Sequence, residues 1–362
     1  MNVLYLINYA GKSGIEKYVE NLVRLLSPRG VKCFFAYNLH GPLADKLADA
    51  GVESLQLSLE WKDALSAAKK LAVFCRERDI EVIHAQGPRE NVIALLARQY
   101  HDALRVVFTY HFTTPCGAVW RQINRCFTRK DHCVIAVCHE SRDVLIANGC
   151  CPEKVKVIYN GVEPAAPRPF SDALQKELGL ESDVFMMTTL ARFDPEKGLD
   201  FLVDSLAALR KKTDRPFCCA VAGDGPLMDD IRARVAAAGL EHEIRLLGYR
   251  TDAPEILAGS QLYLCTSSCN EALSFAILEA MNAGLPCVVT DVGGNRDLAE
   301  TQIVCGSVLD YGDTDGFSDA ILTLMNDEVK RTALSDAARE KIRQRFDLNK
   351  LALAVSETYK KM

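Results

Sequence analysis

The sequence predicts an α/β protein that consists of two doubly wound domains, each built around a parallel sheet. Apolar, β-branched runs alternate with helical stretches along the whole chain, which is typical of β-α units. A length of 362 residues exceeds what one such domain needs and suits two. Between the two series, the prolines of 161–169 exclude both a helix and a central strand. We therefore expect an N-terminal domain over 1–165, a C-terminal domain over 166–345, and a helix over 346–362 that packs back on the first domain.

Each expected strand is a short apolar run bounded by turn residues. The runs are 2–8, 31–37, 80–85, 104–110, 133–138 and 155–159 in the first half, and 184–190, 217–222, 243–248, 261–266, 286–290 and 302–305 in the second. Open sheets of this kind bind ligands at the carboxyl ends of their strands. Polar residues at these ends are therefore the candidates for function, and we expect the two domains to face one another across a ligand-binding cleft.

Composition excludes several classes of protein. With 49% hydrophobic and 25% charged residues, the chain can form ordinary globular cores. It contains no apolar run of about 18 residues that could span a membrane. The opening residues lack a basic leader and a cleavage site, so we expect a first strand and a cytoplasmic protein. The 14 cysteines are scattered without a C-x-x-C pair, which favours reduced, buried thiols over disulfides or a metal site.

Charge is distributed unevenly. Residues 1–165 carry 21 Lys and Arg against 17 Asp and Glu, whereas the remainder carries 22 against 31. Within 98–130 there is one acid among six cations, which are Arg98, Arg105, Arg121, Arg125, Arg129 and Lys130. Apolar residues among them, such as Trp120 and Phe127, are typical of a helix at an anionic membrane surface. A solvated helix face on the first domain explains the pattern equally well, and the acidic chain disfavours nucleic acid.

Two glutamates mark the candidate site of the second half. Glu271 lies on a loop of Ser, Cys and Asn after an expected strand, and Glu279 interrupts an otherwise apolar helical run that Gly284 ends. A carboxylate buried without a partner costs several kcal/mol. Glu279 is therefore expected to face a cleft and a polar ligand, although one exposed helical stripe would also explain it.

Two cations follow the first strand of the second domain. Arg192 supplies a bidentate guanidinium and Lys197 an ammonium, a combination that suits a diphosphate at the edge of a sheet. A dinucleotide-binding motif is not completed here, because Met228 stands where the third glycine would be. We interpret the two glycines that precede Met228, Gly223 and Gly225, as part of a tight turn.

Three weaker signals lie elsewhere. Gly14 is in a turn that opens a helix, where backbone N–H groups could approach a phosphate. His111 and His84 are expected at strand ends, where histidine can act on a ligand, although a lone histidine is more often structural. The sequence Asp313-Thr314-Asp315 has the form of a metal-binding D-x-D, but its position predicts a helix N-cap.

Taken together, these motifs resemble the GT-B glycosyltransferases of family 4, the "glycosyl transferases group 1" type. Seven segments carry the resemblance in order along the chain: the Gly14 loop with Glu16, 109–111, 157–162, 191–198, 222–226, the Glu271/Glu279 pair and Gly293-Gly294. The resemblance implies an EC 2.4 enzyme that transfers a sugar from a nucleoside-diphosphate sugar with retention of configuration. It also implies that the acceptor domain comes first and that no metal or other cofactor takes part.

Roles follow from the resemblance for individual residues. The implied catalytic residues are Arg192, Lys197, Glu271 and His111, and the implied donor-binding residues are Gly14, Arg192, Lys197, Glu271, Leu273, Ser274, Phe275 and Glu279. Arg192 and Lys197 would hold the diphosphate, and Glu271 would bind hydroxyls of the sugar. Glu279 would bind the ribose, and His111 would lie beside the transferring sugar.

The sequence departs from the family pattern at four places. Ser13 replaces a second glycine beside Gly14, Cys138 replaces a common serine, and Asp297 replaces a glutamate. The residues after Glu271 are Ala272-Leu273-Ser274 where Gly-Phe-Gly is common, which leaves the identity of the donor sugar open.

We expect a UDP-sugar in preference to a GDP-sugar, and a lipid-linked or cell-envelope polysaccharide as acceptor. Contact with the inner face of the membrane is expected through 98–130. The alternatives are an enzyme that makes a soluble glycoside, a nucleotide-sugar epimerase, and a non-catalytic sugar-nucleotide binding module.

Overall fold

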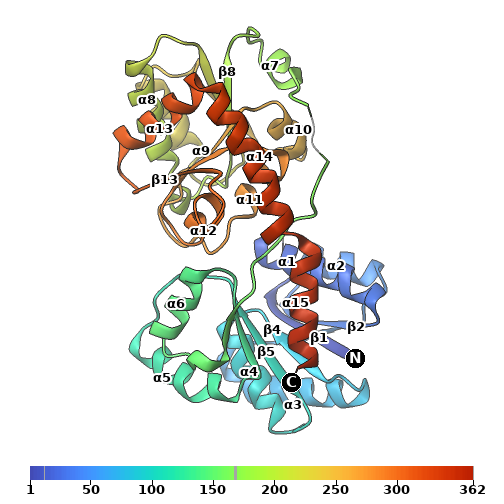
Figure 1. Ribbon diagram of the computed structural model, residues 1–362. Coiled ribbons are helices and arrows are strands. Elements are labelled where there is room, and N and C mark those ends of the chain that lie inside the picture. Colours follow the sequence, from blue (N-terminus) through green and yellow to red (C-terminus); the bar gives the residue numbers. More distant parts are fainter. Residues whose placement is uncertain (12, 167–168, 362) are drawn as a thin grey trace. The chain divides into compact units, whose positions relative to one another are not determined.

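The computed structural model describes residues 1–11, 13–166 and 169–361, and the chain forms two compact units (Figure 1). The first unit holds 1–160 together with 348–362, and the second holds 161–347. The chain thus enters the second unit after Asn160 and returns after Asp347, a few residues from the expected boundaries.

The first unit is built on a parallel sheet with the strand order β3-β2-β1-β4-β5-β6-β7. Its strands are β1 (Asn2–Tyr9), β2 (Lys32–Leu39), β3 (Ser54–Gln56), β4 (Val82–Ala85), β5 (Arg105–Tyr110), β6 (Cys133–Ala136) and β7 (Val155–Val157). Strands β1 and β4 pair directly, and the order of the chain reverses between them. This is the topological switch point of the sheet, where doubly wound folds bind ligands.

Helices cover both faces of this sheet because successive residues of a strand point to opposite sides. The helices are α1 (Gly14–Leu26), α2 (Pro42–Asp49), α3 (Ala64–Glu77), α4 (Pro88–Arg98), α5 (Ala118–Phe127), α6 (His139–Ala147) and α15 (Leu348–Lys360). On β1, Val3 and Tyr5 pack in one core with α1, α2 and α15, whereas Leu4 and Leu6 pack in another with α3 and α4.

The closing helix α15 belongs to the first unit and lies beside α1 (Figure 1). Its residues Leu351, Val355 and Tyr359 are buried in the core that α1 shares. The Tyr359 hydroxyl is 2.6 Å from His84 Nδ1, and His84 Nε2 is 2.6 Å from Thr109 Oγ1. The last helix therefore supplies a polar partner to the centre of the sheet.

His84 is not a strand-end residue that faces a ligand, as the sequence suggested. It lies one residue before the end of β4 and is fully buried. Both ring nitrogens are used by Tyr359 and Thr109, so its role is structural. Burial lowers the pKa of His84 to about 3, with the nearby His111 acting in the same direction.

The depressed pKa of His84 predicts that the first unit loses stability in mild acid. The unfolded chain binds a proton at this histidine below about pH 6.5, whereas the folded chain stays neutral until about pH 3. The free energy of unfolding should therefore fall by about 1.4 kcal/mol per pH unit for this group as pH drops from 6.5 towards 3.

Urea unfolding at several pH values measures this effect. Both tryptophans, Trp61 and Trp120, lie in the first unit, so tryptophan emission follows that unit. In the variant His84→Gln, the free energy of unfolding should fall less steeply with decreasing pH, by about 1.4 kcal/mol per pH unit, because one titrating group has been removed. An unchanged slope in this variant would contradict the assignment.

The second unit repeats the architecture with the strand order β10-β9-β8-β11-β12-β13. The strands are β8 (Phe185–Leu190), β9 (Phe217–Ala222), β10 (Ile244–Gly248), β11 (Leu262–Cys265), β12 (Cys287–Thr290) and β13 (Gly306–Leu309). All neighbours are parallel, and the switch point lies between β8 and β11.

The helices of the second unit are α7 (Ala173–Glu177), α8 (Leu199–Lys212), α9 (Met228–Ala237), α10 (Ala253–Ala258), α11 (Phe275–Ala283), α12 (Asn295–Ala299), α13 (Thr314–Asn326) and α14 (Glu328–Arg345). Helices α8, α9 and α13 share one core with Phe185 and Met187 of β8, and α7 and α10 share another with Met186. As expected, Asp313 caps α13 by accepting a hydrogen bond of 2.9 Å from the N–H of Gly316.

One expected strand is wrong, and one observed strand was not expected. The strand expected at 302–305 is a loop, because Gln302 adopts a left-handed φ of 66° and the Cys305 thiol bonds to carbonyls of α12; the strand that follows is β13. The three-residue β3 is too short to stand out in the sequence.

The cationic stretch 98–130 is not one helix face. Arg98 ends α4 and donates to the carbonyl of Lys130, while Arg105 begins β5 and pairs with Glu81. The exposed cations that remain together are those of α5 and the turn after it, namely Arg121, Arg125, Arg129 and Lys130.

Candidate active site

The carboxyl ends of β8 and β11 carry the two loops that hold most of the predicted site residues. The loop after β8 contains Arg192 and a 3₁₀ turn, Pro195–Lys197, and the loop after β11 leads through Glu271 into α11. Because β8 and β11 are neighbours at the switch point, the two loops meet there.

Lys197 and Glu271 form an ion pair across the switch point. The ammonium nitrogen lies 2.5 Å from Glu271 Oε2, and the two side chains are only 24% and 12% exposed. Burial acts to lower the pKa of Lys197, but the charge and hydrogen bond of Glu271 outweigh it and the pKa is raised. Lys197 therefore stays a fixed cation in a partly dehydrated site, where its field is stronger than in water.

Backbone and hydroxyl contacts hold both loops in place. The Ser267 hydroxyl donates to Glu271 Oε2 at 3.1 Å, and the Thr266 hydroxyl donates to the carbonyl of Lys197 at 3.1 Å. The Ser268 N–H bonds to the carbonyl of Glu196 at 2.9 Å. These contacts hold the two loops together around the Lys197–Glu271 pair.

Two glycines allow the backbones around this pair to approach one another. Gly293 has φ of 60°, and a Cβ there would lie 1.3 Å from the carbonyl oxygen of Glu271. Gly198, with φ of 57°, would place a Cβ 2.1 Å from the carbonyl oxygen of Thr266. Only glycine fits either position.

Arg192 lies on the same loop as Lys197, but its side chain is 72% exposed. Its Nη1 is 2.7 Å from Asp194 Oδ2. An exposed guanidinium of this kind can exchange a weak surface ion pair for a ligand anion, because such pairs contribute little stability.

Helix α11 begins at the candidate site. Ser274 is its N-cap and accepts a hydrogen bond of 3.4 Å from the N–H of Ile277, while Leu273 beside it is buried. The partly buried Phe275 opens the helix, and Glu279 lies about one turn further on, also partly buried. The first backbone N–H groups of a helix attract anions, so α11 adds to the positive character of the site.

His111 follows β5 in the first unit, and Gln86 holds it. The Gln86 side-chain nitrogen donates to the carbonyl of His84 at 3.1 Å, which turns Oε1 towards His111 Nε2 at 3.0 Å. Burial lowers the pKa of His111 to about 3, so the ring is neutral and Nε2 carries the proton. Nδ1 is left as a hydrogen-bond acceptor. No pattern in the sequence indicated Gln86 as its partner.

Gly14 is the exposed first residue of α1. The helix is capped by Ser13, whose hydroxyl accepts from the N–H of Ile15 at 3.3 Å, while Glu16 accepts from the Ser13 N–H at 2.8 Å. The adjacent Lys12 is outside the described residues, so the start of this loop is defined from Ser13 onwards.

Over the residues that the structure describes, no cluster of three or more His, Cys, Asp or Glu side chains is arranged to hold a metal ion. All 14 cysteines are free thiols and most are buried, as predicted. Within the described ranges, no helix combines the length and apolar character that crossing a bilayer requires.

Two protein-family models match consecutive parts of the chain. "Glycosyltransferase Family 4" matches residues 12–166, and "Glycosyl transferases group 1" matches residues 170–341. Between them they cover most of its length. The chain belongs to glycosyltransferase family 4.

Curated relatives of this glycosyltransferase are similar over most of their length. The UDP-Gal:alpha-D-GlcNAc-diphosphoundecaprenol alpha-1,3-galactosyltransferase of Escherichia coli is 27% identical over 346 residues, which cover 88% of this chain and 86% of the relative. The N-acetyl-alpha-D-glucosaminyl L-malate synthase of Bacillus anthracis is 25% identical over 307 residues, or 82% of this chain and 78% of the relative.

Among solved structures, Anabaena Alr3699/HepE in complex with UDP superposes with a TM-score of 0.89 at 22% identity, over 100% of both chains. This likeness confirms the predicted GT-B fold. The family models and the curated relatives confirm the assignment to transferases of class EC 2.4. The roles of individual residues remain predictions.

Proposed function

We propose that this glycosyltransferase moves a sugar from a UDP-sugar to a lipid-linked or other cell-envelope saccharide with retention of anomeric configuration. The observation that carries the proposal is the Lys197–Glu271 pair at the switch point of the second sheet, with Arg192 on the same loop. Two cations and a carboxylate at a strand edge match a diphosphate joined to a polyhydroxylated ring.

The relatives support the class of donor and acceptor. The Escherichia coli relative acts with UDP-Gal on a diphosphoundecaprenol-linked sugar, and the Anabaena structure holds UDP. The Bacillus anthracis relative is named for a malate product, so a soluble acceptor is the second candidate.

In the proposed reaction, the acceptor oxygen bonds to the anomeric carbon on the face from which the diphosphate departs. The bond between that carbon and the phosphate oxygen breaks, and the acceptor hydroxyl proton passes to the departing diphosphate. Arg192 and Lys197 stabilise the charge that develops on the diphosphate, which is the role a metal ion fills in other enzymes. Glu271 orients the sugar hydroxyls, Glu279 binds the ribose, and His111 Nδ1 accepts a hydrogen bond from the transferring sugar. Gly14, Leu273, Ser274 and Phe275 complete the proposed donor contacts.

Donor binding is tested by thermal unfolding with UDP-, GDP- and ADP-sugars in buffer with EDTA. At 100 times its Kd, the correct donor should add about 2.7 kcal/mol to the free energy of unfolding. We expect UDP-sugars to do this, and the variant Arg192→Met to weaken the effect. If none of the three classes raises the melting temperature, the proposal fails.

The configuration of the product and the class of acceptor are tested with the best donor. NMR of the product should show the same anomeric configuration as the donor. Transfer to a polyprenyl-diphosphate-linked sugar in preference to free malate or free sugar would support the lipid-linked acceptor, and the reverse preference would support the soluble glycoside.

We also propose that the enzyme works at the inner face of the membrane through α5 and the turn after it, because the rest of 98–130 belongs to other elements. The four exposed cations of α5 and the turn after it accompany Val119, which is 74% exposed. Flotation with anionic vesicles should recover the protein, and charge reversal of Arg121 and Arg125 should abolish recovery.

A further inference from the structure

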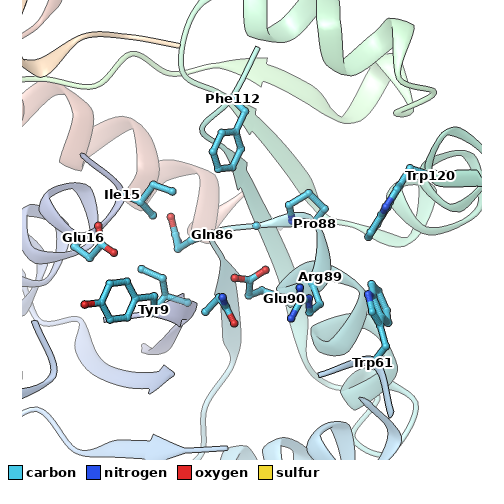
Figure 2. A pocket seen from close by; sticks show the side chains of 13 residues that line it. Tyr9, Ile15, Glu16, Trp61, Gln86, Pro88, Arg89, Glu90, Phe112 and Trp120 are labelled. Atoms are coloured by element: carbon cyan, nitrogen blue, oxygen red, sulfur yellow. The ribbon is translucent and has the colours of Figure 1, made fainter. Parts of the chain in front are cut away.

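A pocket of about 560 Å³ lies at the switch point of the first sheet (Figure 2). Its walls come from the carboxyl ends of β1 and β4, from the first turns of α1 and α4, and from Trp61, Phe112 and Trp120. This volume is typical of a small-molecule site, and the position is where a doubly wound sheet binds its ligand. All lining residues belong to the first unit.

Aromatic side chains form one wall of this pocket although they are costly to expose. The chain has only two tryptophans, and both line it, with ring centroids 5.6 Å apart and ring planes inclined by 55°. Trp61 is 47% exposed, and Tyr9 and Phe112 are also exposed. Exposed aromatic surface gathered at one pocket indicates a binding site, because a ring face can receive C–H groups of a ligand.

The floor of the pocket is polar. Glu90 is buried in the first turn of α4, where the backbone amides of Asn8 and of Glu90 itself bond to its carboxylate. Gly87 leaves room for it, since a Cβ there would lie 2.5 Å from Glu90 Oε2. Arg89 stands beside it, and Figure 2 places both between the tryptophans and Gln86. Carboxylate and guanidinium groups next to an aromatic wall suit a polyhydroxylated ring better than an alkyl chain.

Gln86 connects the pocket to His111 within the first unit. This residue lines the pocket and also holds His111, whose Nε2 is 3.0 Å from Gln86 Oε1. A ring held against the tryptophans therefore lies on the same side of the sheet as the histidine assigned to the transferring sugar.

We propose that this pocket binds a pyranose ring of the acceptor saccharide, stacked on Trp61 and Trp120 and hydrogen-bonded to Glu90 and Arg89. The inference rests on the proposed function. It adds that the enzyme recognises the acceptor by its sugar and not by its lipid.

Intrinsic fluorescence tests the inference directly, because both tryptophans are in the pocket. The protein is titrated, with and without UDP, with the methyl α-pyranosides of glucose, galactose and N-acetylglucosamine, and separately with geranyl diphosphate. At least one pyranoside should change the tryptophan emission in a saturable manner, and Glu90→Gln should weaken that binding. No response to any pyranoside up to its solubility limit, or a saturable response to geranyl diphosphate alone, would overturn the proposal.

Kinetics with Trp61→Ala and Trp120→Ala provide a second test. Loss of one stacking face should raise the acceptor KM about tenfold relative to the donor KM. Tyr100→Ala is the matched control, because Tyr100 is a 40% exposed aromatic of the same unit that lies outside the pocket against Lys69. If transfer proceeds and neither tryptophan variant changes this ratio, the inference is wrong.

The two proposals fail separately. If no nucleotide sugar binds or reacts, the proposed function fails, while the pyranoside titration still decides the pocket. If donors bind and transfer occurs without a response from the tryptophans, only the pocket assignment falls.

Discussion

Replacing Lys197 by methionine should lower the turnover of sugar transfer by about 10²–10³-fold, which is the usual effect of removing one electrostatic stabiliser of a developing anion. Lys197 is the partly buried cation at the switch point of the second sheet, 2.5 Å from Glu271. Methionine keeps most of the unbranched side chain and removes the charge together with its N–H donors. Initial rates at saturating donor and acceptor measure the change.

The control for this variant is Lys211→Met, which removes an exposed charge from α8 in the same unit. It should leave turnover within about twofold, because isolated surface charges contribute little. Thermal unfolding of both variants separates loss of chemistry from loss of folding. A turnover within threefold of the unmodified enzyme in Lys197→Met would exclude Lys197 from leaving-group stabilisation.

Alanine at Gly293 should destabilise the second unit by about 3 kcal/mol or more and abolish stabilisation by the donor. The added Cβ would lie 1.3 Å from the carbonyl oxygen of Glu271, so the loop that carries Glu271 must move. Chemical denaturation with and without a UDP-sugar measures both effects.

Gly239→Ala separates the steric effect from backbone strain. Gly239 has a φ of 67°, close to the 60° of Gly293, but a Cβ there meets nothing within 4 Å. Its substitution should cost only the left-handed conformation, about 1–2 kcal/mol. Equal losses in the two variants would mean that the contact with Glu271 is unimportant.

Much of the fold could be predicted from the sequence because buried parallel strands are continuous apolar runs. The runs that became β1, β5, β8 and β9 are nearly uniform in β-branched or apolar residues, and the structure places strands there. The apolar run at 302–305 was wrongly predicted to be a strand, because Cys305 is buried against α12 and not in the sheet. Apolar character indicates burial, but it does not distinguish a strand from a packed loop.

Part of the candidate site was also predictable, for a different reason. Lys197 and Glu271 each follow a strand, and the carboxyl ends of parallel strands share one edge. That they touch depends on β8 and β11 being neighbours, which no local pattern reveals. Likewise, Trp61 and Trp120 are far apart in the sequence, and only the strand order of the first sheet brings them into contact. Gln86 could not be recognised as a site residue because its contact with His111 is visible only in the structure.

The path of the chain has a consequence for synthesis. The segments that connect the units lie side by side, since Val162 pairs with Asp347 and its N–H bonds to the carbonyl of Phe346 at 2.9 Å. Helix α15 leaves the ribosome only after the entire second unit, yet its Tyr359 completes the buried contacts of His84. The first unit therefore cannot complete its core until the second unit has been translated, because His84 lacks its partner Tyr359 until then. Nascent chains released before residue 348 should consequently be recognised by chaperones and proteases through their first half.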